Sequence, residues 1–230
     1  MNRSFKIYPK ASETPDEWVG FLAVDPLSKT GRYTVVIKDP QGQALASTTL
    51  EVRSASFQSQ SIQVSKSTAG LQAEAGELER VNALKHLHSG HRYWQFPLRF
   101  QKPVPQCMNS PFGVKRIVNG RFTGNYHKGI DQKSPQGQVI VSPEAGKVVI
   151  AKPFQLHGGT VGLDHGQGIS SIYIHMSHIA VKEGSLVQKG QVLGKVGATG
   201  FAAGPHLHWG VFINSIPINP VSVVAGITPC

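Results

Sequence analysis

Two histidines, His206 and His208, flank Leu207 in the segment GPHLHWG. Residues two apart in a β-strand point to the same face of the sheet. If the segment is a strand, both imidazoles therefore enter one cavity while Leu207 enters the core on the other side.

A second pair, His127 and Asp131, lies in the segment YHKGID. A spacing of four also fits one face of a helix, but Gly129 and the turn-like SPQG at 134–137 favour an extended chain. In an extended segment, positions 127 and 131 share a face and supply one imidazole and one carboxylate. Together with His208 they form a His, His, Asp set, which suits one zinc ion with a fourth position open to water.

Zinc-dependent hydrolysis also needs a group that accepts a proton and passes it on. The helical HExxH motif, which places a glutamate base between two histidine ligands, is absent from the sequence. The available substitutes are His206, beside His208, and His175 in the segment IYIH. If the two isoleucines of that segment face the core of a strand, Tyr173 and His175 face the cavity.

The other histidines have simpler interpretations. His157 and His165 lie in glycine-rich turns, where a structural role is the more common one. His178 is a rival for the role of His175, but it lies where the strand is expected to end. Near a predicted helix end stand His86, His88 and His91. Because residues two apart on a helix point in different directions, we do not expect that trio to form a metal site.

The chain divides into three stretches with different patterns. Residues from about 17 to 65 hold short β-prone runs separated by turns and predict a small antiparallel β-sandwich. From about 68 to 90, apolar residues recur every three or four positions, which predicts an amphipathic linker helix. From about 92 onward, glycine-rich β runs predict a mostly antiparallel β domain. We therefore expect a mostly β fold with an N-terminal β-sandwich at 1–66, a helical linker at 67–95 and a second β domain at 96–230.

Four motifs in order, within residues 107 to 220, resemble the lysostaphin/LytM-type family of cell-wall metalloendopeptidases. They are SPFG at 110–113 followed by Lys115 and Arg116, HKGID at 127–131, YIHM at 173–176, and GATG at 197–200 leading to GPHLH at 204–208. The resemblance implies that His127, Asp131 and His208 bind the zinc ion. It also implies that His175, rather than His178, acts with His206 to activate water and stabilise the developing oxyanion.

The resemblance further implies a zinc endopeptidase that hydrolyses peptide cross-links of bacterial peptidoglycan. The bond joins D-alanine to diaminopimelate, as in many Gram-negative relatives, or lies in a glycine bridge, as in lysostaphin, and the two-domain layout favours the former. The expected location is the periplasm or another part of the cell envelope, or outside the cell. Some LytM-like proteins have lost ligands and serve as wall-binding proteins or activators of other wall hydrolases, but this chain keeps all three. The N-terminal stretch is similar to the immunoglobulin-like β domain that precedes the peptidase domain in some relatives.

The composition of the chain narrows the classes of partner that we expect it to bind. The 230 residues carry a formal net charge of +10, which suggests an anionic partner. The chain lacks an obvious basic and aromatic platform, so we expect no nucleic acid. No apolar run approaches the roughly 20 residues that cross a bilayer, so we expect no stable membrane insertion. We expect a monomer. Cys107 and Cys230 are compatible with one disulfide and equally with two unrelated thiols.

Overall fold

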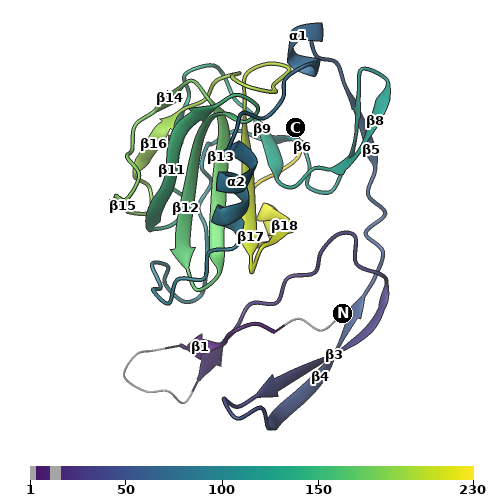
Figure 1. Ribbon diagram of the computed structural model, residues 1–230, viewed down its shortest axis with the longest axis vertical. Helices are drawn as coiled ribbons and strands as arrows, with labels where there is room; N and C mark the ends of the chain where they lie inside the picture. The colour runs from purple at the N-terminus through teal and green to yellow at the C-terminus, as the bar shows by residue number, and fades with distance from the viewer. Residues whose placement is uncertain (1–3, 11–16) are drawn as a thin grey trace.

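The computed structural model describes residues 4–10 and 17–230, and the fold is mostly β, as the sequence predicted (Figure 1). The strands of the largest sheet are β6 (Met108–Ser110), β9 (Ile130–Lys133), β11 (Gly146–Phe154), β12 (Gly158–Gly166), β13 (Ile169–Met176), β15 (Leu186–Val187), β17 (His206–Ile213) and β18 (Ile216–Ile218). Seven of them follow one another in the order β15, β11, β12, β13, β17, β9 and β6, and β18 also pairs with β17. All of these pairings are antiparallel.

Two smaller sheets have three strands each. One contains β10 (Val139–Val141), β16 (Val192–Lys195) and β14 (His178–Ile179), and the other contains β5 (Ser59–Ile62), β7 (Lys115–Val118) and β8 (Arg121–Tyr126). The pairing of β5 with β7 is parallel, so a strand of the N-terminal region extends the hairpin formed by β7 and β8. A short 3-10 helix, Pro220–Ser222, follows β18.

The core lies on both faces of the main sheet. Every residue of β12 and β13 is buried. Along β13, Ile172 and Ile174 belong to one apolar cluster and Tyr173 to the other, which is the alternation expected of a strand covered on both faces. Leu207 is fully buried in the larger cluster with Trp209.

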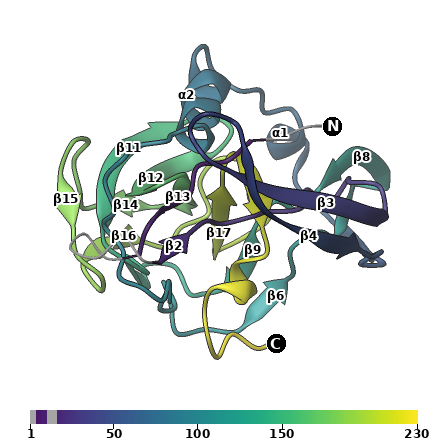
Figure 2. The ribbon, with the colours of Figure 1, turned by 90° about the horizontal axis from the view of Figure 1, so that it is seen from below.

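Helix α2 (Glu77–Lys85) lies against β11, β12 and β13 and covers the smaller cluster with Val81 and Leu84 (Figures 1 and 2). The predicted helix over 68–90 is therefore wrong in extent. Gly76, with a φ of +78°, breaks the helical path just before α2, and α1 (Lys66–Ala69) is a separate turn of helix. Within the described residues, no helix has the length and apolar character needed to span a bilayer.

The N-terminal region contains β1 (Tyr8–Pro9), β2 (Trp18–Val19), β3 (Gly31–Lys38) and β4 (Ala44–Val52). Among the described strands, β1 pairs only with β2 and β3 only with β4. The β3–β4 ladder lies apart from the main sheet (Figure 1), whereas Val19 of β2 packs against the larger apolar cluster. The described strands of this region pair as separate two-stranded ladders, and the β-sandwich stays a prediction. A two-stranded ladder cannot enclose a core, and Tyr33, Val36 and Ile37 are accordingly exposed.

The division into 1–66, 67–95 and 96–230 stays a prediction, as does the immunoglobulin-like domain, and residues 1–3 and 11–16 of its first part lie outside the described residues. Several contacts cross the predicted boundaries, including the hydrogen bond from Asn214 to the Phe21 carbonyl. β5 pairs with β7, and α2 packs on the main sheet. The stretch predicted as a linker is thereby part of the packed structure around that sheet.

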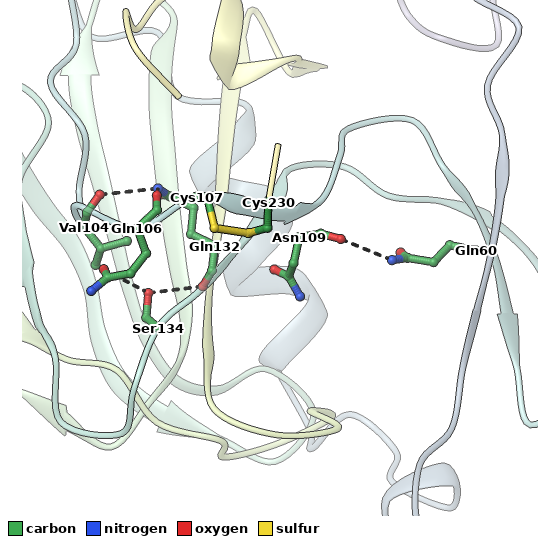
Figure 3. The surroundings of a disulfide bond; sticks show 8 residues. All are labelled: Gln60, Val104, Gln106, Cys107, Asn109, Gln132, Ser134 and Cys230. Atoms are coloured by element: carbon green, nitrogen blue, oxygen red, sulfur yellow. Dashed lines mark hydrogen bonds between the residues drawn. A yellow bond between two sulfur atoms is a disulfide. The ribbon is translucent and has the colours of Figure 1, made fainter. Parts of the chain in front are cut away.

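Cys107 and Cys230 form a disulfide, which decides between the two alternatives left open by the sequence (Figure 3). The bond joins residues 123 positions apart. Beside it, the Met108 N–H donates to the Thr228 carbonyl and the Cys230 N–H donates to the Met108 carbonyl, both at 2.9 Å. The C-terminal segment is therefore fastened to β6, which pairs with β9.

Replacing Cys107 and Cys230 together by serine should lower the free energy of unfolding by about 2–5 kcal/mol, because the unfolded chain regains the freedom that the cross-link removes. Urea unfolding of the oxidised protein and of the variant measures the difference. The oxidised protein treated with reductant should match the variant. A variant as stable as the oxidised protein would contradict this expectation.

Candidate metal centre

Antiparallel pairing of β9 with β17 places Asp131 opposite His208. His127 lies in the short connection between β8 and β9. Within that connection, a Cβ at Gly129 would lie 2.4 Å from the carbonyl oxygen of Trp209 and 2.8 Å from Nε2 of His208. Only glycine permits such a close approach, so Gly129 lets the connection run directly against β17.

The three residues predicted as ligands converge. Oδ1 of Asp131 is 2.9 Å from Nε2 of His127 and 2.9 Å from Nδ1 of His208. The same two ring nitrogens are 2.9 Å apart. In residues 4–10 and 17–230, this is the single group of three His, Cys, Asp or Glu side chains close enough to hold a metal ion.

Hydrogen bonds to the outer atoms of His127 and Asp131 orient the atoms of these side chains that face one another. Nδ1 of His127 is 2.9 Å from the carbonyl oxygen of Pro111. Because a carbonyl only accepts, Nδ1 donates here, and Nε2 is the ring nitrogen that faces Asp131 and His208. Nη2 of Arg116 donates to Oδ2 of Asp131 at 2.6 Å, which leaves Oδ1 directed at the two histidines.

The protonation states suit a cation. Burial raises the pKa of Asp131, but the charges of His127 and His208 and the hydrogen bonds with both outweigh burial and hold that pKa well below its ordinary value. Burial is also the main reason that the pKa of His208 falls to about 4. At neutral pH the set offers a carboxylate and neutral imidazole nitrogen, the donors that zinc accepts.

His175 and His206 lie beside this set. Their ring centroids are 4.8 Å apart, and the centroid of His175 is 6.4 Å from that of His208. Nδ1 of His175 donates to the Thr199 carbonyl at 2.9 Å, and Nδ1 of His206 donates to the Gly204 carbonyl at 2.8 Å. In the neutral form of each ring, Nε2 is therefore the unprotonated nitrogen. Burial, followed by the neighbouring His206 and His208, lowers the pKa of His175 to about 3. The structure thus brings together all five predicted site residues, whose roles stay predictions.

The remaining histidines make structural contacts or lie outside the site. His165 is buried, with Nδ1 2.7 Å from the Ala145 carbonyl oxygen and Nε2 2.8 Å from Oγ of Ser171. Nδ1 of His157 is 2.6 Å from Oε1 of Glu77. Outside the converging group lie His86, His88, His91 and His178.

Two residues of the site's surroundings could not be identified from the sequence. In the sequence, Arg116 was noted only as a basic residue of the first motif, and its contact with Asp131 was not predicted. Glu77 received no role, because an acidic residue in the first turn of a helix is ordinary. The motif position of Arg116 offered a signal, whereas nothing near Glu77 in the sequence indicates its distant partner, His157.

A β-sheet that brings two histidines and an aspartate together beside two further histidines is the kind of site found in metal-dependent hydrolases. The family model of Peptidase family M23 matches residues 125–220. A crystal structure assigned to peptidase M23 of Pseudomonas aeruginosa is 31% identical, and the match covers 89% of this chain and 77% of that one with a TM-score of 0.68. The chain belongs to peptidase family M23.

Curated relatives match the same region. The DD-carboxypeptidase/endopeptidase Mpg of Neisseria meningitidis is 38% identical over 116 residues, which are 50% of this chain and 26% of that protein. The peptidoglycan DD-endopeptidase ShyB of Vibrio cholerae is 34% identical over 114 residues, which are 49% of this chain and 26% of that protein. The matched part thus spans about a quarter of the length of these relatives.

The metal-free protein should lose stability as the pH falls from about 6.5 to about 5. The folded-state pKa values of His175 and His208, about 3 and about 4, lie below the ordinary 6.5. The unfolded chain therefore binds more protons in this window, and each histidine adds a slope of up to about 1.4 kcal/mol per pH unit. Urea unfolding of chelator-treated protein measures the slope. His175→Asn should reduce it, whereas the change His178→Asn at an exposed position should not, and a slope unchanged in both would argue against the assignment.

Arg116→Met should weaken zinc binding about 10- to 100-fold, because Asp131 loses the donor that orients its carboxylate. Competition with a chromophoric chelator measures the affinity. Arg121→Met is the matched control, since Arg121 is exposed on the neighbouring strand β8. Equal zinc affinity in the Arg116 and Arg121 variants would show that the contact does not support the metal site.

Proposed function

We propose that this protein is a zinc-dependent endopeptidase that hydrolyses peptide cross-links of bacterial peptidoglycan. The observation that carries the proposal is the convergence of His127, Asp131 and His208 beside His175 and His206. Membership of peptidase family M23 supports the peptidase activity. The relatives named as DD-endopeptidases support the wall peptide as the substrate class.

In the proposed mechanism, His127, Asp131 and His208 hold one zinc ion. Zinc bound there supplies Lewis acidity, which polarises a peptide carbonyl and makes water more acidic. His175 and His206 divide the proton handling through Nε2. One accepts a proton of the attacking water at Nε2 and, as the imidazolium, stabilises the developing oxyanion before it delivers that proton to the leaving amine. The other accepts a hydrogen bond from the same water at Nε2 and holds it in place for attack.

The hydrogen bonds of the two catalytic histidines support this division. Their Nδ1 atoms donate to the carbonyls of Thr199 and Gly204, so each ring keeps one orientation and one tautomer. Burial of His175 keeps it neutral, and hence able to accept a proton, at neutral pH.

The proposed bond joins D-alanine to diaminopimelate, and the proposed location is the periplasm or another part of the cell envelope, or outside the cell. The names of the Neisseria and Vibrio relatives support a DD bond of peptidoglycan, and hence action at the cell envelope. The choice of diaminopimelate rests on the family resemblance. The formal charge of +10 is consistent with an anionic envelope substrate.

Purified zinc-loaded protein should cleave defined cross-linked muropeptides, with fragments identified by mass spectrometry, and a chelator should stop the reaction until zinc is restored. His208→Ala should lose both zinc and turnover. His175→Ala should keep zinc and lose turnover by about 10²- to 10⁴-fold, because only proton transfer is removed. The control His178→Ala should match the unmodified protein.

Retention of full turnover by His175→Ala would refute the assigned mechanism. Binding of wall fragments without any cleavage by the zinc-loaded protein would instead favour the alternative of a wall-binding protein or an activator of other hydrolases.

A further inference from the structure

His175 has an unusual backbone conformation. Its φ is +65°, in the left-handed region that residues other than glycine rarely adopt. Such a conformation persists only where the surroundings hold it. Here the His175 N–H donates to the His157 carbonyl at 3.0 Å, and the Thr199 N–H donates to the His175 carbonyl at 3.4 Å. Because the Thr199 carbonyl also accepts from the His175 ring, two segments fix both the backbone and the imidazole.

Those two segments also contact each other. The turn between β11 and β12 contains Leu156 and His157. The Phe201 N–H donates to the Leu156 carbonyl at 2.8 Å, and the Gly159 N–H donates to Oγ1 of Thr199 at 2.9 Å. A displacement of the β11–β12 turn would therefore move the partners of His175 on both sides.

Glu77 holds that turn from outside the sheet. Its side chain is fully buried at the start of α2. Oε1 accepts the backbone N–H of His157 at 2.8 Å and faces Nδ1 of His157 at 2.6 Å. The Leu156 N–H lies 3.1 Å from both carboxylate oxygens, and the Glu74 N–H donates to Oε2 at 2.9 Å.

The Glu77 carboxylate is ionised at neutral pH. Burial alone would raise the pKa of Glu77, but its hydrogen bonds, those with His157 first, outweigh burial and lower that pKa to about 2. Hydrogen bonds to an ionised acceptor are roughly twice as strong as neutral ones. Glu77 is thus a rigid anionic anchor for the turn, and it lies outside residues 125–220, the part matched by the family model.

We infer that Glu77 is a positioning residue for His175, acting through the β11–β12 turn. The carboxylate fixes Leu156 and His157, the His157 carbonyl holds the backbone of His175, and the same turn holds the Thr199 segment that orients the ring. The inference rests on the proposed function, in which His175 transfers a proton.

If Glu77 only attached α2 to the sheet, removing another attachment of α2 should have the same effect as removing the Glu77 carboxylate. α2 has other attachments, because Val81 and Leu84 are buried in the smaller cluster and Arg80 forms an ion pair with Glu183 at 2.8 Å. Arg80→Met removes an attachment of the same helix away from the turn and is therefore the matched control.

Glu77→Gln should lower kcat on a defined muropeptide about 10- to 100-fold, as expected when a reacting group is misplaced by a fraction of an ångström to an ångström. KM and zinc content should not change. His157→Ala should have a similar effect, and combining it with Glu77→Gln should add little, since the two residues act as one unit. His157→Asn, which keeps a side-chain N–H near the position of Nδ1, should recover most of the activity, and Arg80→Met should stay within about twofold of the unmodified protein.

A second measurement separates this inference from the proposed function. In zinc-loaded protein, NMR should show faster amide exchange and a shifted imidazole signal for His175 in Glu77→Gln but not in Arg80→Met. If the unmodified protein cleaves nothing, the proposed function fails, and the NMR comparison still decides whether Glu77 positions His175.

Unchanged His175 signals and unchanged kcat in a folded Glu77→Gln protein would overturn the inference. Equal losses in Glu77→Gln and Arg80→Met would also overturn it, because they would show a general loosening of α2. If Glu77→Gln does not fold, the comparison of His157→Ala with His157→Asn tests the inference in its place, and equal activity in those two variants would count against it.

Discussion

The register between β9 and β17 is the constraint on which the candidate metal centre depends. It places Asp131 opposite His208 and Ile130 opposite Trp209. Because side chains alternate between the two faces of a sheet, a slip by one residue would turn Asp131 into the core and Ile130 toward the histidines. Ile130 and Trp209 are fully buried. Apolar burial on one face therefore enforces the alignment of polar atoms on the other.

The polar face has an electrostatic requirement of its own. Two ring nitrogens and a carboxylate oxygen lie 2.9 Å from one another with little access to water. Their lone pairs repel unless a proton or a cation lies among them, and burial makes protonation of His208 unfavourable. Arg116 offsets the charge of Asp131 at Oδ2 only. The arrangement therefore favours a cation at the centre, which agrees with the ligand chemistry of the set.

The sequence predicted the parts of the fold and site that follow from short-range periodicity. Side-chain alternation and the placement of glycines predict three features: the HxH pair on one strand face, the extended segment from His127 to Asp131, and the antiparallel β domain. The choice of His175 came from the family resemblance. The helix predicted over 68–90 was too long, because the spacing of apolar residues does not reveal that Gly76 takes a left-handed conformation. The N-terminal sandwich was predicted from β-prone runs, but whether strands stack depends on partners that periodicity does not identify. Glu77 and Arg116 act through contacts 80 and 15 positions away, which no local pattern encodes.

Two elements that precede β6 reach the site, and they reach different parts of it. On β5, Gln60 accepts from Oγ of Ser110 at 2.6 Å, and that oxygen lies 3.4 Å from Nδ1 of His127. On α2, Glu77 holds the turn that contacts His175. One element thus supports a proposed metal ligand, and the other supports the histidine proposed to transfer a proton. A buried polar group left without its hydrogen bond costs free energy. The five site residues therefore do not specify a working geometry by themselves. The segment before the peptidase motifs supplies contacts that the site needs.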